Sequence, residues 1–361
     1  MGITDLLGKR QPQSHTPDAP AISQAVPTAA LPGGEVKVIG RSLTGSGRVA
    51  SRPRVLFGHT DAELLTATAS EYILAKVPEE SGSVPLTVVT PDGTKTNGVD
   101  FKIAVQIADG IHAVANPAVD PEGNIYTTLS GPRGEETPVS IFKVDTDFKL
   151  KQYATGITNP TGLAVGPDGQ LYVSSRNDGS IYRIAANGNM SLYSQGMGVA
   201  TGIAFDREGS LYAGDRSGTI FKISREQDHE IYVFATLEAS VAAYHLAFDY
   251  ADNLYVTAPT TTSRDPVYMI DPDGQITEFY NGLGRPQGLA FDTAGNLYVA
   301  ASFEGKRGIV RITPQREASL VLAGNNIVGL AFTPTGSCIV ATSTALFQVS
   351  WDIQGKLLAG A

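Results

Sequence analysis

The stretch Gly288–Ala300, GLAFDTAGNLYVA, returns five more times along the chain, about every 40 residues. The other copies are NPAVDPEGNIYTT (116–128), GLAVGPDGQLYVS (162–174), GIAFDREGSLYAG (202–214), HLAFDYADNLYVT (245–257) and GLAFTPTGSCIVA (329–341). Such a period is typical of four-stranded propeller blades and not of helical repeats.

Each copy predicts two short strands joined by a turn. Residues 288–291 and 297–300 are apolar runs, and the intervening DTAGN supplies a turn in which Gly295 can adopt positive φ. The small residues suit an innermost strand, which lies against five others around a narrow axis. Two further strand-like runs, for instance 309–312 and 320–322, complete an antiparallel sheet. We therefore predict an all-β fold that contains a six-bladed β-propeller.

The chain has 361 residues, and a propeller of roughly 250 residues leaves about a hundred for a second domain. The net charge of −9 falls on the propeller, because residues 1–103 hold ten basic and ten acidic groups and leave 17 basic and 26 acidic ones for 104–361. Such a surface repels phosphate backbones, so nucleic acid is not an expected partner. The chain has one cysteine, Cys338, which excludes an intrachain disulfide, and we expect a buried, inert thiol.

Residues 1–19 lack the apolar core of a secretory signal, and no apolar run reaches the roughly 18 residues of a membrane helix. We expect a disordered leader over 1–19, no membrane span, and a cytoplasmic location.

Residues 20–103 predict a β-sandwich, because Val36 and Val38 alternate with polar neighbours and Pro-Gly-Gly and Pro-Asp-Gly mark turns. The region also resembles the IPT/TIG family of immunoglobulin-like domains. The matching positions are Pro20-x-Ile22, Pro27, Pro32-Gly33-Gly34, Val36-x-Val38-x-Gly40, Phe57-Gly58 and Val77-Pro78. The resemblance implies a spacer or interaction module. A DNA-binding role, known in some members, is not supported, since this region is electrically neutral.

The junction IAVQIADG (103–110) looks like the fourth strand of a blade. The same form occurs in KQYATG (151–156), EFYNG (278–282), LVLAG (320–324) and KLLAG (356–360). Six blades need six outer strands, and there are seven candidates. The junction either closes the ring by joining the last blade or ends the sandwich, and both alternatives stay open here.

The residue before the Gly-Leu-Ala of each repeat is expected to face a pocket at the mouth of the central channel. These six residues are Ala115, Thr161, Thr201, Tyr244, Gln287 and Val328. Their hydroxyls, amide and single aromatic ring suit a neutral hydrogen-bonding ligand such as a sugar.

The repeats also resemble NHL repeats and the six-bladed, TolB-like gluconolactonase family. That resemblance implies a divalent metal held by Glu, Asn and Asp at positions that are Ala115, Thr161 and Gln287 here. A hard cation needs charged oxygen ligands, so these replacements argue against the hydrolase. The streptogramin lyases, also similar, use a His before the repeat's Gly, and no copy here has one. We expect no catalytic residue, metal or cofactor, with a divalent metal such as calcium as the alternative.

Three further residues are candidates for ligand binding. Arg176 and Asp215 follow second strands, on loops that often bind ligands, although surface salt links are commoner there. His245 replaces the repeat's glycine and acts either as an acid or base at the channel mouth or as a space-filling polar residue.

Three hypotheses of function follow. The first is a non-enzymatic binding or scaffold protein whose propeller loop face binds a small neutral ligand, a glycan or a protein. The second is a lactone hydrolase with relocated metal ligands, such as Asp215 and Glu304. The third is recognition through the sandwich. The sequence leaves the oligomeric state open.

Overall fold

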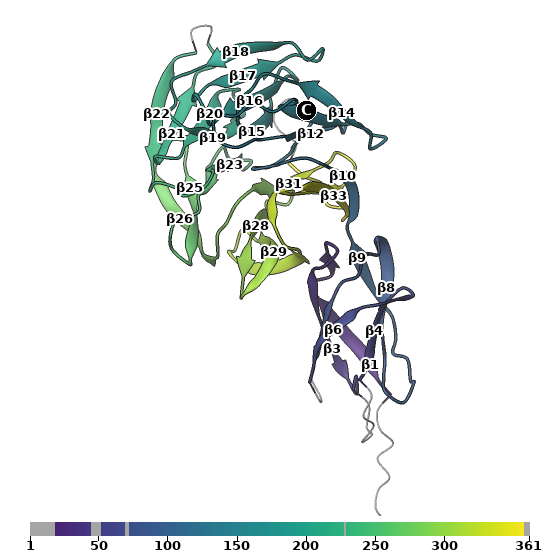
Figure 1. Ribbon diagram of the computed structural model, residues 1–361. Coiled ribbons are helices and arrows are strands. Elements are labelled where there is room, and N and C mark those ends of the chain that lie inside the picture. The colour runs from purple at the N-terminus through teal and green to yellow at the C-terminus, as the bar shows by residue number, and fades with distance from the viewer. Residues whose placement is uncertain (1–18, 45–51, 69–71, 227–228, 357–361) are drawn as a thin grey trace, which may run out of the picture.

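The computed structural model describes residues 19–44, 52–68, 72–226 and 229–356, and it confirms an all-β protein with a sandwich followed by a propeller (Figure 1). The expected leader lies outside these residues except for Ala19, and so does nearly all of KLLAG. Within these ranges, no helix has the length and hydropathy needed to cross a membrane.

The sandwich consists of two sheets around one apolar core. One sheet has the order β1 (Ala21–Val26), β3 (Glu35–Arg41), β7 (Tyr72–Lys76), β6 (Glu63–Ala67), and the other β2 (Ala29–Ala30), β9 (Val99–Ile103), β8 (Gly82–Val89), β4 (Arg54–Phe57), β5 (Thr60–Asp61). Val36 and Val38 are fully buried, and the rings of Phe57 and Phe101 meet edge to face at 5.0 Å. The predicted alternation is therefore confirmed: along β3 the two valine side chains face the core, and the polar ones beside them face outward.

Among the described residues, six four-stranded antiparallel units surround the propeller axis. The first three are β11 (Ala118–Val119), β12 (Ile125–Thr128), β13 (Ile141–Val144), β14 (Leu150–Ala154); β15 (Pro160–Val165), β16 (Leu171–Ser175), β17 (Ile181–Ile184), β18 (Met190–Ser194); and β19 (Ala200–Phe205), β20 (Leu211–Asp215), β21 (Thr219–Ile223), β22 (Ile231–Thr236). The next two are β23 (His245–Phe248), β24 (Leu254–Thr257), β25 (Asp265–Ile270), β26 (Ile276–Leu283); and β27 (Leu289–Phe291), β28 (Leu297–Phe303), β29 (Lys306–Ile312), β30 (Ala318–Ala323).

The sixth blade settles the question of ring closure. Its order is β31 (Ile327–Phe332), β32 (Ser337–Thr342), β33 (Ala345–Ser350) and then β10 (Val105–Asp109). β10 pairs antiparallel with β33, with Gln106 opposite Phe347 and Asp109 opposite Ala345. The junction strand thus closes the ring, and it covers a sheet edge that would otherwise stay unpaired.

The repeated turn behaves as its residues predict. Gly295 has φ +80°, and Asp292 Oδ1 accepts hydrogen bonds from the backbone N–H groups of Ala294 (2.9 Å) and Asn296 (2.8 Å). The Tyr298 hydroxyl donates to Asp292 Oδ2 at 3.1 Å. The aspartate therefore fixes the turn and satisfies the hydroxyl of the repeat's buried tyrosine, which explains why these residue types recur together.

The same tyrosines join neighbouring blades. The Tyr172 ring meets Phe205 of the next inner strand edge to face at 4.8 Å, and Tyr255 meets Phe291 in the same way at 4.8 Å. Such edge-to-face pairs contribute about 0.5–1.5 kcal/mol each beyond the area that they bury. Among the described residues, four of the six blade boundaries carry such an aromatic pair, which helps to hold those blades in a fixed angular relation.

The sandwich and the propeller share a sheet. The two-residue strand β2 pairs in parallel with β30 of the fifth blade on one side and with β9 of the sandwich on the other. Its side chains alternate: Ala29 is buried in a propeller core with Leu322, whereas Ala30 is buried in the sandwich core. The backbone N–H of Leu31 also donates to Ala323 O at 2.8 Å. A continuous nine-stranded sheet therefore connects the domains.

Candidate functional site

We call the end of the ring at which the inner strands begin the loop face, and the opposite end the tail face. A cavity of about 120 Å³ lies on the ring axis and is lined by residues of all six inner strands. Most of its wall is apolar, and the polar side chains that reach it are Asn116, His245 and Lys356. Asn116 replaces the glycine of the first repeat, and its amide joins Leu289 O (2.8 Å) to the backbone N–H of Leu330 (3.0 Å).

Three of the predicted mouth residues are not exposed at the mouth. Thr161, Thr201 and Tyr244 are 1%, 1% and 0% exposed. The Thr201 hydroxyl donates to Gly214 O at 2.9 Å and accepts the backbone N–H of Tyr244 at 3.0 Å. The Thr161 hydroxyl donates to Asn159 O at 3.2 Å, and that of Tyr244 donates to Glu238 O. These side chains connect neighbouring segments, and the expectation of an open ring of hydroxyls is corrected.

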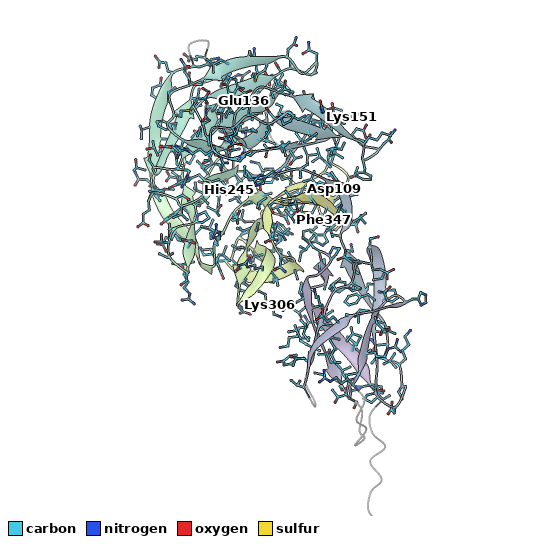
Figure 2. All side chains as sticks on the ribbon, in the orientation of Figure 1. Asp109, Glu136, Lys151, His245, Lys306 and Phe347 are labelled. Carbon is cyan, nitrogen blue, oxygen red and sulfur yellow. The ribbon has the colours of Figure 1, made fainter. Side chains whose placement is uncertain are left out.

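His245 is the first residue of β23, lies in the interior of the propeller and lines the axial cavity (Figure 2). His245 is 3% exposed, and burial lowers the pKa of its imidazole from 6.5 to about 4. The imidazole is therefore neutral at pH 7.

The depressed pKa predicts a pH-dependent loss of stability. Between pH 6.5 and about 4 the unfolded chain binds a proton at His245 that the folded chain does not, so stability falls as pH falls through this window and is constant above it. From pH 6.5 to pH 5 the loss from this group amounts to about 2 kcal/mol. Urea unfolding of the protein and of His245→Leu at pH 7 and pH 5 measures it.

The variant is expected to show a smaller pH dependence than the natural protein. His59→Leu serves as the control, because His59 is exposed on the turn after β4. Equal pH dependence in the natural protein and His245→Leu would contradict the assignment.

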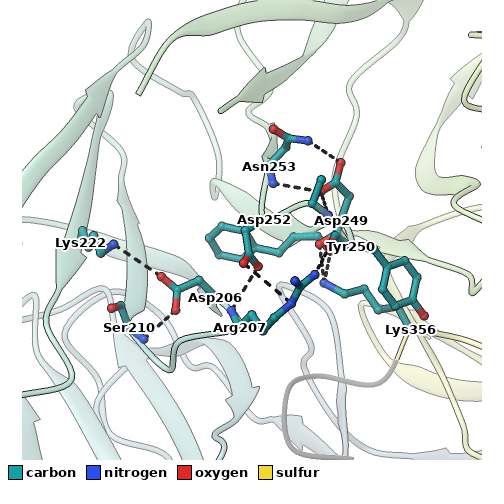
Figure 3. A network of polar contacts seen from close by, with 11 residues as sticks. Asp206, Arg207, Ser210, Lys222, Asp249, Tyr250, Asp252, Asn253 and Lys356 are labelled. Atoms are coloured by element: carbon teal, nitrogen blue, oxygen red, sulfur yellow. Dashed lines mark hydrogen bonds and ion pairs between the residues drawn. The ribbon is translucent and has the colours of Figure 1, made fainter. Parts of the chain in front are cut away.

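On the tail face, the C-terminal segment makes polar contacts with the turns of neighbouring blades (Figure 3). Lys356 Nζ donates to the carbonyl oxygens of Phe248 (2.8 Å) and Asp249 (2.7 Å). Burial lowers the pKa of Lys356, whereas the carboxylates of Asp252 and Asp249 oppose that shift. Arg207 ties the neighbouring turn, with its Nε 3.9 Å from Asp252 Oδ2. The segment therefore connects blades on this side, next to the axial cavity that Lys356 also lines.

A polar groove of about 270 Å³ lies on the loop face between the fifth and sixth blades. Gln287 lines it, together with Ser302, Asn326 and Ser343. Within the described part of the chain, no protein group hydrogen-bonds to the side-chain amides of Gln287 and Asn326. Two arginines, Arg285 and Arg307, stand exposed at its rim. We call this the Gln287 groove.

The other two loop candidates have different surroundings. Asp215 is 7% exposed, and its carboxylate accepts the backbone N–H of Val199 at 2.7 Å and the hydroxyl of Ser217. This geometry gives Asp215 a loop-fixing role. Arg176 is half-buried and lines a second loop-face groove with Arg133 and Arg216. Neither Arg133 nor Arg216 is among the six residues that the repeats place at the channel mouth.

The residues at the positions implied by the lactonase resemblance do not fit a hard divalent cation. Ala115 offers no oxygen, the Thr161 hydroxyl is buried on Asn159 O, and Gln287 is uncharged. Over the described ranges, no three His, Cys, Asp or Glu side chains gather in a metal-binding set. Asp215 and Glu304, the relocated ligands of the alternative hypothesis, lie in different blades, Asp215 at the end of β20 and Glu304 directly after β28. Cys338 is buried, and burial raises the pKa of its thiol.

The sequence of the N-terminal region matches the model of the IPT/TIG domain over residues 20–103. Residues 20–103 are an IPT/TIG domain. The matched span ends at the last residue of β9, so the family boundary coincides with the passage from the sandwich into the ring-closing strand β10. No curated protein matches the sequence.

Solved structures show the same fold at low sequence identity. A putative gluconolactonase has a TM-score of 0.56 and 18% identity, over 70% of this chain and 93% of its own. An auxiliary nutrient binding protein from Bacteroides ovatus has a TM-score of 0.53 and 13% identity, over 92% of this chain and 98% of its own. Virginiamycin B lyase from Staphylococcus aureus, solved with quinupristin, has a TM-score of 0.50 and 15% identity, over 83% and 99%.

Proposed function

We propose that the protein is a non-enzymatic binding protein that holds a small neutral ligand or a glycan in the Gln287 groove. One observation carries this proposal: two side-chain amides and two hydroxyls converge in one loop-face groove, and the protein does not use the amides itself. Neutral donors and acceptors of this kind match the hydroxyl groups of a sugar. Among the described residues that line the groove, none is a carboxylate, imidazole or thiol, so the groove offers hydrogen bonds and no group suited to proton transfer.

The fold relatives are consistent with this role. The auxiliary nutrient binding protein from Bacteroides ovatus is one of the structures that share the fold over 92% of this chain. The IPT/TIG domain is fixed to the fifth blade by β2, and it acts in this proposal as a rigid spacer that presents the propeller. In the other form of this proposal, the loop face binds a protein partner.

The proposal predicts that Gln287→Ala and Asn326→Ala each weaken ligand binding by about tenfold, because each removes a hydrogen bond to the ligand. Neutral oligosaccharides on an array identify a ligand, and calorimetry measures its affinity for each variant. Gln275→Ala is the matched control, since Gln275 is exposed on the turn between β25 and β26 and does not line the groove.

The enzymatic alternative has its own test. Lactone hydrolysis is assayed with calcium, manganese or zinc, and thermal melting is followed with and without each metal. We expect neither turnover nor a metal-dependent change in Tm. Turnover together with a rise in Tm on addition of one metal would overturn the non-enzymatic assignment.

A further inference from the structure

Three arginines from three consecutive blades meet in a groove of about 410 Å³ on the loop face. Arg133 lies between β12 and β13, Arg176 follows β16, and Arg216 follows β20. Arg176 and Arg216 occupy the same position of their repeats, directly after the second strand, so the rotation from blade to blade brings them side by side. Val199, Ser217 and Ser240 complete the wall.

The guanidinium groups in this groove are held in place by the backbone. Arg176 Nη2 donates to Gly131 O at 3.3 Å, and Arg216 Nη2 donates to Val241 O at 3.1 Å. The Nε atoms of Arg176 and Arg216 are buried and have no hydrogen-bond partner within the described structure. A buried donor without a partner is costly, and neither Nε atom finds an acceptor among the described residues.

The loop that carries Arg133 is also fixed. Asn159 is 1% exposed, and its Nδ2 donates to Gly131 O (2.9 Å) and Pro132 O (2.8 Å), while its Oδ1 accepts the backbone N–H of Gly134 at 2.7 Å. Three hydrogen bonds therefore hold the residues on both sides of Arg133. The exposed third cation reaches the groove from a defined position and not from a free loop.

No carboxylate neutralises the three charges among the described residues. The ion pairs of the described chain include none of these arginines. Glu135 and Glu136 lie exposed on the loop of Arg133, and the carboxylate of Asp215 is already held by Val199 and Ser217. Burial lowers the pKa of Arg176, and the charges of Arg216 and Arg133 lower it further, with no acidic group opposing them.

We propose that Arg133, Arg176 and Arg216 form a binding site for a small molecule with a phosphate group. Guanidinium groups present paired N–H donors that match the oxygens of phosphate. Three positive charges also suit a doubly charged phosphate better than a singly charged carboxylate. The site goes beyond the neutral ligand proposed above. It lies in a different groove from Gln287, so each proposal can fail without the other.

The experiment titrates the full chain with inorganic phosphate and, separately, with acetate, by calorimetry at low ionic strength. Phosphate is expected to bind saturably and more tightly than acetate. Arg176→Gln and Arg216→Gln are each expected to weaken phosphate binding by about tenfold or more, because each removes charge-assisted hydrogen bonds. Arg176→Lys keeps the charge but loses the paired donors, and it is expected to weaken binding as well.

Arg264→Gln is the matched control. Arg264 is exposed on the loop before β25, and its replacement by Gln changes the net charge by the same amount outside the groove. Phosphate affinity equal to that of the natural protein is expected for this control. Tm values without ligand verify that each variant is folded. Absence of saturable phosphate binding, acetate binding of equal strength, or an equal loss in Arg264→Gln would overturn the proposal.

Discussion

Ala29→Asp is expected to lower the free energy of unfolding by about 3–5 kcal/mol, because it places an unpaired charge in a fully buried position. Ala29 lies in β2, between the last strand of the fifth blade and the last strand of the sandwich. Its side chain packs with Leu322 and Ile309 of the propeller, and these groups offer the carboxylate no hydrogen bond. The substitution therefore destabilises the propeller core, although Ala29 belongs to the N-terminal region 20–103.

Urea unfolding measures this loss, with two probes that report on different regions. The chain has one tryptophan, Trp351, which lies 6.0 Å from the Tyr298 ring in the sixth-blade region and reports on the propeller. Circular dichroism reports on all strands. In the natural protein the two probes are expected to give coincident transitions, since the domains share a sheet.

Ala67→Asp provides the control, because Ala67 is exposed on the edge strand β6 of the sandwich. Its effect is expected to stay within about 0.5 kcal/mol. If Ala29→Asp were as stable as this control, β2 would not join the two cores in the way that the structure places it.

The sequence predicts the propeller well because the signal for each blade is local and is repeated six times. In the copy at 288–300 an apolar run, an Asp-x-x-Gly turn and a buried tyrosine lie within thirteen residues. The other copies keep most of these features, and such a local pattern can be read without knowledge of distant contacts. The sequence does not decide the pairing of the ring-closing strand, for the opposite reason. Residues 105–109 pair with 345–350, more than 200 residues away, and a short strand carries no mark of its distant partner.

The candidate site was harder to predict because a side chain's use depends on the neighbouring blade. The sequence predicts Thr201 at the mouth, but its hydroxyl accepts a hydrogen bond from the backbone N–H of Tyr244, which precedes the inner strand of the next blade. The arginines of the second groove are separated by 43 residues (Arg133 to Arg176) and 40 residues (Arg176 to Arg216), one per blade. Only the blade repeat itself, which aligns Arg176 with Arg216, could have indicated from sequence that two of them are neighbours.

The narrow axis gives the second large effect, for Gly202→Ala. A Cβ atom at Gly202 would lie 2.2 Å from Tyr244 O and 3.0 Å from His245 Cα, and both belong to the backbone of the adjacent inner strand. Backbone cannot move aside as a flexible side chain does, so the two inner strands must separate. We expect a loss of about 3 kcal/mol of unfolding free energy in urea titrations.

Gly169→Ala separates this clash from backbone strain. At Gly169 a Cβ atom would meet nothing within 4 Å, but the residue has φ +72°, so the same replacement costs only about 1–2 kcal/mol through its left-handed backbone. A larger loss at Gly202 than at Gly169 is therefore the expected order. Because Gly202 has an ordinary φ, the reverse order would mean that the inner strands lie farther apart than this packing requires, and the glycine of the repeat would then need another explanation than close approach around the axis.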